Sequence, residues 1–96
     1  MSRPRRCRRI RRQPDIKYFK PASLRKCELE EVILSFEEYE AIRLVDYENK
    51  DQKKSAAKME ISQPTFHRLL KEARKKIAES IIEGKALRIE GGIYKY

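Results

Sequence analysis

The hydrophobic positions of residues 51–83 follow the spacing of two amphipathic helices joined by a tight turn. This arrangement is the pattern of a helix-turn-helix. Ala56 is expected where the two helices pass closest, because a larger side chain there would push them apart. The four apolar side chains expected to be buried between the helices are Met59, Ile61, Phe66 and Leu69.

The second helix of this motif has definable ends. Ser62 is its expected N-cap, and Pro64 falls in the first turn, where a missing N–H costs nothing. Gly84 is the expected C-terminal cap. The helix should therefore span about residues 63–83, roughly 30 Å at 1.5 Å per residue, and its second half must cover either the terminal strands or a second copy of the chain.

Another helix and a short strand are predicted before the motif. Residues 27–34 end in the β-branched pair Val32 and Ile33, which favours a strand. Ser35 and Glu38 have the spacing of a capping box and predict the start of a supporting helix that runs to about residue 47.

The C-terminal residues 86–96 predict a β-hairpin, because Gly91 and Gly92 suit a two-residue turn between apolar segments. An isolated hairpin is marginal in water, so a third strand must come from residues 31–34, from the N-terminal segment or from another subunit. The expected fold is mostly α with a small β element, a three-helix core plus this C-terminal β-hairpin. We divide the chain into an Arg-rich arm with an extended segment, residues 1–26, and a helix-turn-helix domain, residues 27–96.

Charge is distributed in blocks along this basic chain, whose formal net charge is +9. Residues 1–27 carry a net charge of +10, residues 28–48 carry −7, and residues 49–96 carry +6. Two basic regions around an acidic one indicate a polyanionic partner that meets the ends of the chain. The acidic block has three interpretations: a solvated face, an internal partner for the arm, or a contact surface for another protein.

Several stretches together resemble a known family. The runs FEEYEAIRLVDYE, AAKMEISQPTFHRLLKEARKKIA and EGKALRIEGG, with RRCRRI near the N-terminus, are similar to a small uncharacterised prokaryotic family of predicted DNA-binding proteins. The helix-turn-helix of that family resembles region four of sigma factors, which reads the promoter −35 element. The resemblance covers nearly the whole chain, and it implies transcriptional regulation with RNA polymerase as a candidate partner. Two departures are Lys53 and Lys54, where acidic residues are common in the family, and Glu60 in place of a turn glycine.

We expect sequence-directed binding of double-stranded DNA, with the start of the second motif helix in the major groove. The side chains expected to reach base edges are Gln63, His67, Arg68 and Lys71. Those expected to contact the DNA backbone are Lys53, Lys54, Ser62, Thr65, Arg74 and Lys75. The arginines expected to follow a minor groove or the backbone as an arm are Arg3, Arg5, Arg6, Arg8 and Arg9.

Two alternatives from other classes remain open. The domain could act as a protein-interaction module of the transcription machinery through its acidic helix, or bind RNA through the arm. Catalysis is not expected, because the sequence indicates no paired carboxylate in an apolar pocket, no Cys–His pair at credible spacing and no phosphate-cradling glycine loop. No metal or cofactor site is expected either, since Cys7 and Cys27 are accompanied by a single histidine, His67, in a different element. Free thiols are the expected state, and the open alternative is an intermolecular Cys7 bridge or a metal shared across a dimer.

The short length also bounds the assembly and the location of the protein. A 96-residue chain buries only about 60–65% of its unfolded surface, which favours a homodimer. No apolar run is long enough for a membrane span or a signal peptide, so we expect a cytoplasmic protein.

The first prediction concerns Glu60, which occupies a turn position that usually holds glycine in a left-handed conformation. A non-glycine residue there costs about 1 kcal/mol. We therefore expect Glu60→Gly to leave thermal stability unchanged or to raise it. A clear fall in melting temperature would mean that the turn is not left-handed.

Overall fold

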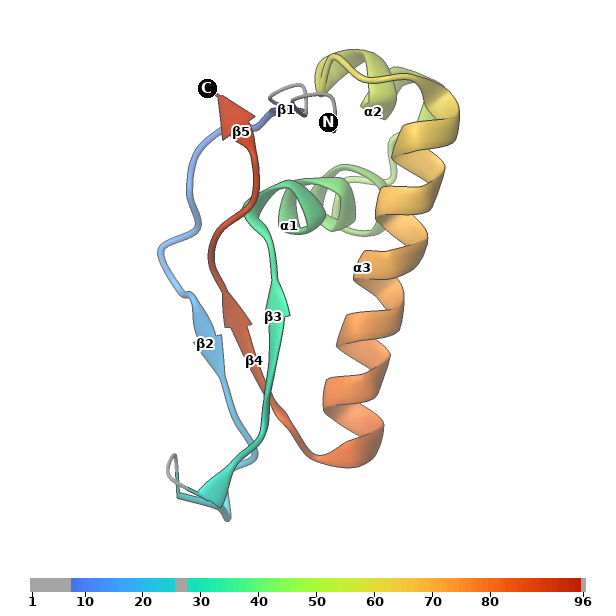
Figure 1. Ribbon diagram of the computed structural model, residues 1–96. Helices are drawn as coiled ribbons and strands as arrows, with labels where there is room; N and C mark the ends of the chain where they lie inside the picture. The colour runs from blue at the N-terminus through green and yellow to red at the C-terminus, as the bar shows by residue number, and fades with distance from the viewer. Residues whose placement is uncertain (1–7, 26–27, 96) are drawn as a thin grey trace, which may run out of the picture.

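The computed structural model describes residues 8–25 and 28–95, and it contains three α-helices and five short strands (Figure 1). The helices are α1 (Phe36–Ile42), which continues into the π-helical turn η2 (Arg43–Tyr47), α2 (Gln52–Lys58) and α3 (Gln63–Glu83). The strands are β1 (Arg8–Arg9), β2 (Tyr18–Phe19), β3 (Glu31–Leu34), β4 (Ala86–Ile89) and β5 (Tyr94–Lys95). The expected fold class, mostly helical with a small β element, is confirmed.

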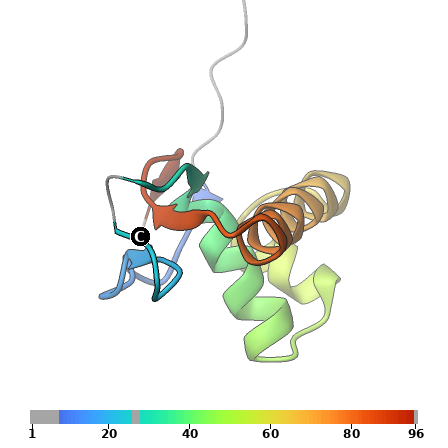
Figure 2. The same ribbon diagram turned by 90° about the horizontal axis from the view of Figure 1, so that it is seen from below.

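The helices and the sheet form two parts of one molecule. α1 and α2 lie beside the N-terminal half of α3, whereas the sheet lies alongside its C-terminal half (Figure 1). Seen along α3, the strands occupy one side and the helices the other (Figure 2). The N-terminal half of α3 is therefore supported by two helices, while its far end stands next to strands.

The strands do not form the expected C-terminal hairpin. β4 is the central strand of a three-stranded sheet, antiparallel to β2 and parallel to β3. Both edges of β4 are therefore occupied, and β5 has no edge on which to fold back. Instead β5 pairs in parallel with β1, which makes a separate two-stranded ribbon from the two ends of the described chain.

Gly91 and Gly92 direct the chain from β4 to β5 over the start of α1. Their φ values are 76° and 97°, in the region that favours glycine. The amide of Phe36 donates to the carbonyl oxygen of Gly91 at 3.0 Å, which fixes this crossing to the first turn of α1. The glycine pair thus makes a crossing connection and not a hairpin turn.

The buried core lies where α1, α2, α3 and the sheet meet. Ala56, Met59 and Phe66 are fully buried, as the hydrophobic pattern predicted. Leu69 and Ile61 are only partly buried, and Leu70 takes the expected place of Leu69 in the core. The reason is geometric: positions 66, 70 and 73 form the i, i+4, i+7 stripe that faces α1 and α2.

The predicted helix ends are confirmed. Ser35 Oγ accepts from the amide of Glu38 at 3.1 Å, and Glu38 Oε1 accepts from the amide of Ser35 at 2.9 Å, which completes the capping box. Gly84 ends α3 with φ 67° and ψ 39°. The supporting helix reaches Tyr47 as expected, although its last five residues are π-helical.

The acidic helix is not a solvated face. Glu37, Glu38 and Glu40 of α1 are only 2%, 5% and 4% exposed. Glu37 Oε2 lies 3.0 Å from Arg8 Nε, and Glu38 Oε1 lies 2.8 Å from Lys76 Nζ. The interpretation that fits these three carboxylates is an internal partner, in part for the N-terminal arm.

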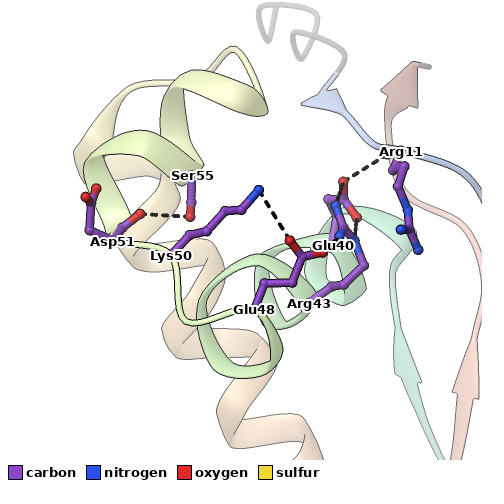
Figure 3. A network of polar contacts seen from close by, with 7 residues as sticks. All are labelled: Arg11, Glu40, Arg43, Glu48, Lys50, Asp51 and Ser55. Atoms are coloured by element: carbon purple, nitrogen blue, oxygen red, sulfur yellow. Dashed lines mark hydrogen bonds and ion pairs between the residues drawn. The ribbon is translucent and has the colours of Figure 1, made fainter.

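The third carboxylate, Glu40, belongs to a wider network of polar contacts (Figure 3). Its carboxylate accepts from Arg43 Nε at 2.7 Å and from the amide of Arg11 at 2.8 Å. Arg43 also contacts Glu48, which lies 3.3 Å from Lys50. These contacts connect the chain after β1 to α1, η2 and the entrance of α2.

The second prediction compares two alanine substitutions at neighbouring glycines. Both Gly91→Ala and Gly92→Ala place a side chain at positive φ, at a cost of about 1 kcal/mol each. Only at position 92 would the new Cβ lie 2.9 Å from Ser35 Cβ, whereas at position 91 nothing lies within 4 Å. We expect Gly92→Ala to lower the free energy of unfolding by about 1–3 kcal/mol more than Gly91→Ala, measured by urea denaturation. Equal losses of unfolding free energy in the two variants would show that the chain can move away from Ser35 at little cost.

Candidate nucleic-acid interface

The N-terminal half of α3 begins at a well-defined cap. Thr65 donates its amide to Ser62 Oγ at 3.3 Å, and the two hydroxyl oxygens lie 2.8 Å apart. Pro64 occupies the first turn, as expected from the sequence. The start of the helix is thus fixed, with two hydroxyls at its positive end.

The side chains expected to contact bases share one exposed side of this half-helix. Gln63, His67 and Lys71 follow each other at i, i+4 and i+8, and Arg68 lies next to them. All four are exposed, while Phe66 and Leu70, on the side that packs against α1 and α2, are buried. The arrangement is a polar and basic face held in place by a core behind it; we call these four residues the basic face.

Two of these side chains make contacts that limit their freedom. His67 Nδ1 lies 3.4 Å from Gln52 Oε1 of α2, so the basic face is linked to the first turn of the neighbouring helix. Arg68 Nη2 donates to Thr65 Oγ1 at 3.5 Å, which turns the guanidinium toward the start of α3. The sequence did not predict a role for Gln52, because exposure to solvent alone is enough to explain a polar residue in the first turn of a helix.

The residues expected to contact a DNA backbone surround the basic face unevenly. Lys53 and Lys54 on α2 and Lys75 on α3 are exposed. Arg74, by contrast, forms two hydrogen bonds with Asp46 of η2, at 3.0 Å and 2.6 Å. The guanidinium lowers the pKa of the Asp46 carboxyl, so this pair is charged on both sides and the positive charge of Arg74 is offset locally.

The turn between α2 and α3 is left-handed at Glu60, whose φ is 59°, as the sequence predicted. Its carboxylate accepts from Lys95 Nζ of β5 at 3.1 Å and from Arg9 Nη1 of β1 at 3.2 Å. Lys95, and next Arg9, hold the pKa of Glu60 below its usual range. No local sequence signal predicts these contacts, since the partners lie 35 and 51 residues away.

The arm is only partly within the described residues. The Arg8 side chain is 11% exposed and paired with Glu37, so its charge is not available to a ligand. Arg9 is 55% exposed and stays next to the turn, because its amide donates to the carbonyl oxygen of Met59 at 3.1 Å. The predicted arm contacts of Arg3, Arg5 and Arg6 fall outside the described residues, as do Cys7 and Cys27.

An apolar groove follows the other half of α3. It has a volume of about 520 Å³. It lies between Phe19 of β2, Pro21 just after this strand, Leu87 of β4, and Ile77 and Ile81 of α3. Ile81 is 74% exposed, and the neighbouring Ile82 is 82% exposed. The second half of α3 therefore does not cover the terminal strands completely.

Comparison with known proteins identifies the family. A family model described as "Protein of unknown function DUF134" matches residues 1–96. The chain belongs to the DUF134 family. DUF134 relatives named "UPF0251 protein" include those of Halothermothrix orenii, 56% identical over 99% of this chain, and Moorella thermoacetica, 52% identical over 98% of it. A third, from Pelotomaculum thermopropionicum, is 50% identical over 99% of the chain.

These matches confirm the expected small prokaryotic family. The chain spans 70%, 63% and 72% of the length of the three relatives. No solved structure matches the chain. The similarity of the DUF134 chain to sigma region four stays a prediction.

Two kinds of feature are absent from residues 8–25 and 28–95. No helix in these ranges combines the length and the apolar character that a membrane span requires. In the same ranges, no group of three His, Cys, Asp or Glu side chains is arranged to hold a metal ion.

Proposed function

We propose that the protein binds double-stranded DNA with α2, the turn and α3 acting as a helix-turn-helix, and that it regulates transcription. The observation that carries this proposal is the basic face: four polar or basic side chains at the start of α3, all exposed, over a fully buried stripe. A helix of this kind fits a major groove with its first turns. The residues with base-reading chemistry are Gln63, whose amide suits adenine, and Arg68, whose guanidinium suits guanine.

The surroundings of the basic face support the same function. The cap hydroxyls of Ser62 and Thr65 and the exposed Lys53, Lys54 and Lys75 can contact phosphates on either side of the groove. The acidic side chains of α1, which would repel DNA, are buried and paired. The chain can thus carry an acidic block and still present a positive surface.

The burial of α1 weighs against the alternative of a protein-interaction module that uses the acidic helix. Glu37, Glu38 and Glu40 would be the contact residues of such a module, and they already bind Arg8, Lys76 and Arg43. RNA polymerase remains a candidate partner of the DNA-bound form through other surfaces. RNA binding by the arm is an outcome that the following experiment can detect.

Selection of bound oligonucleotides from a random duplex pool tests the proposal most directly. We expect a defined consensus, and a palindromic consensus would also report the spacing of two half-sites. Structured RNA at equal salt should compete poorly with the selected duplex. Recovery of no consensus, or efficient competition by RNA, would refute sequence-directed duplex binding.

The third prediction concerns the base-reading role of Arg68. Arg68→Ala should weaken binding to the selected duplex by about 1–3 kcal/mol, roughly fivefold to 150-fold, and relax specificity at one base pair. Lys75→Ala is the matched control, because loss of a phosphate contact weakens binding to all sequences alike and lowers the salt slope by about 1. If Arg68→Ala also weakens selected and random duplexes equally, Arg68 contacts only phosphate.

We further propose that a second copy of the chain covers the apolar groove. Along one line of α3, the exposed residues change from Gln63 and Arg74 to Ile81, which lines the groove. A partner on the apolar part therefore lies next to the bound DNA, and a second copy would bring another basic face to the same duplex. A homodimer is thus the occupant that matches the proposed function.

The fourth prediction tests this dimer. Ile81→Glu should shift the protein toward monomers in sedimentation equilibrium, because a charge would be buried at the centre of the contact. On a duplex with two half-sites, the variant should lose cooperative binding and keep single-site binding. Tyr47→Glu is the control, since Tyr47 is equally exposed but lies outside the groove. A wild-type protein that is monomeric both free and on DNA would rule the dimer out.

A further inference from the structure

The turn between α2 and α3 is attached to both ends of the described chain through Glu60. The carboxylate reaches Arg9 Nη1 with one oxygen and Lys95 Nζ with the other, at 3.2 Å and 3.1 Å. The hydrogen bond from the Arg9 amide to the Met59 carbonyl adds a backbone contact one residue earlier in the turn. Strands β1 and β5 are therefore attached at the point where the chain enters α3; we call these three contacts the turn attachment.

Glu60 is costly at this position for two reasons. Its backbone has a φ of 59°, which disfavours a residue with a side chain. Its negative charge also stands beside a surface proposed to meet phosphates. The two ion pairs are exposed, and pairs of this kind contribute little to stability. Stability alone therefore does not explain why a carboxylate is placed in this turn.

The contacts offer a different explanation, which concerns placement. Arg9 belongs to β1, and its side chain is 55% exposed next to the turn. Its amide is bonded to Met59 and its guanidinium to Glu60, so both its backbone and its side chain are attached at the entrance of α3. Whatever fixes β1 to the turn therefore fixes Arg9 beside the start of α3.

We infer that Glu60 is a positioning residue that registers β1, and with it Arg9, against the basic face of α3. The inference rests on the proposed DNA binding, because it makes Arg9 and the start of α3 one preformed surface. Preformed contacts raise affinity, since the side chains are ordered before the ligand arrives. If β1 were attached less firmly, its side chains would become ordered only on binding, and this cost would lower the affinity.

The inference predicts the sign of a binding effect. If Glu60 acted only as a negative charge near DNA, Glu60→Gln would strengthen binding by removing repulsion. If Glu60 positions β1, the same substitution weakens binding despite the lost repulsion. We expect duplex affinity to fall about threefold to tenfold, the size of the cost of ordering one or two side chains.

The experiment compares three full-length variants with the wild-type protein. Glu60→Gln removes the charge, Glu60→Gly removes the charge and the backbone strain, and Glu83→Gln is the matched control. Glu83 is an exposed carboxylate that pairs with Lys85 at 3.4 Å, beyond the far end of the basic face. Each protein is measured by thermal melting, by duplex binding at low salt, and by amide hydrogen exchange at Arg9 and Ile10.

We expect Glu60→Gln and Glu60→Gly to weaken duplex binding by the same factor and to speed exchange of the Arg9 amide severalfold. Glu60→Gly should do so without a lower melting temperature, which separates positioning from stability. Glu83→Gln should change neither binding nor exchange at Arg9.

Two results would overturn the inference. One is stronger duplex binding by Glu60→Gln, and the other is an Arg9 amide that exchanges at the wild-type rate in both Glu60 variants. A wild-type protein that binds no duplex would instead remove the proposed function. In that event the role in DNA presentation falls with it, while amide exchange still decides whether Glu60 attaches β1 to the turn.

Discussion

The pairing of three buried carboxylates on α1 is the constraint on which the rest of the structure depends. An unpaired charge inside a protein costs several kcal/mol, so Glu37, Glu38 and Glu40 each require a basic partner at close range. These partners come from three different elements: Arg8 from β1, Lys76 from α3 and Arg43 from η2. α1 is therefore the point at which the N-terminal strand, the long helix and the π-helical turn are fixed to one another.

This internal neutralisation changes the outer charge of the molecule. Glu37, Glu38 and Glu40 are buried and paired, so they do not form an acidic surface on α1. The lysines of α2 and the basic face of α3 stay exposed. The three carboxylates of α1 therefore add little negative charge to the surface, whereas α2 and the start of α3 present cations there.

Local signals in the sequence predicted the parts of the fold that local physics decides. The capping box of Ser35, the N-cap Ser62 and the cap Gly84 depend on contacts within a few residues, and all three were correct. The hairpin was wrong because strand pairing is a non-local choice. Nothing within residues 86–96 shows that β2 and β3 already occupy both edges of β4.

Leu69 and Leu70 illustrate a finer limit of the same kind. Both leucines continue an apolar stripe from Phe66, at i+3 and i+4, so the sequence alone does not decide between them. The approach of α1 and α2 decides it, and Leu70 is buried. The exposure of the basic face does not depend on this choice, because neither leucine belongs to the face.

The candidate site shows that the sequence overstates the number of basic side chains available to a ligand. Counting arginines and lysines near a motif treats each as available, yet Arg8 and Arg74 are held by Glu37 and Asp46, residues far away in the chain. The available charge is set by these long-range pairs, and no spacing rule contains them. The charge that a ligand can meet is therefore smaller than the net charge of +9 suggests, and the exposed side chains that carry it near the basic face include Lys71 and Lys75 on α3 and Lys53 on α2. Glu60 is a carboxylate in the turn of the surface proposed to meet DNA, and its two basic partners offset its charge there.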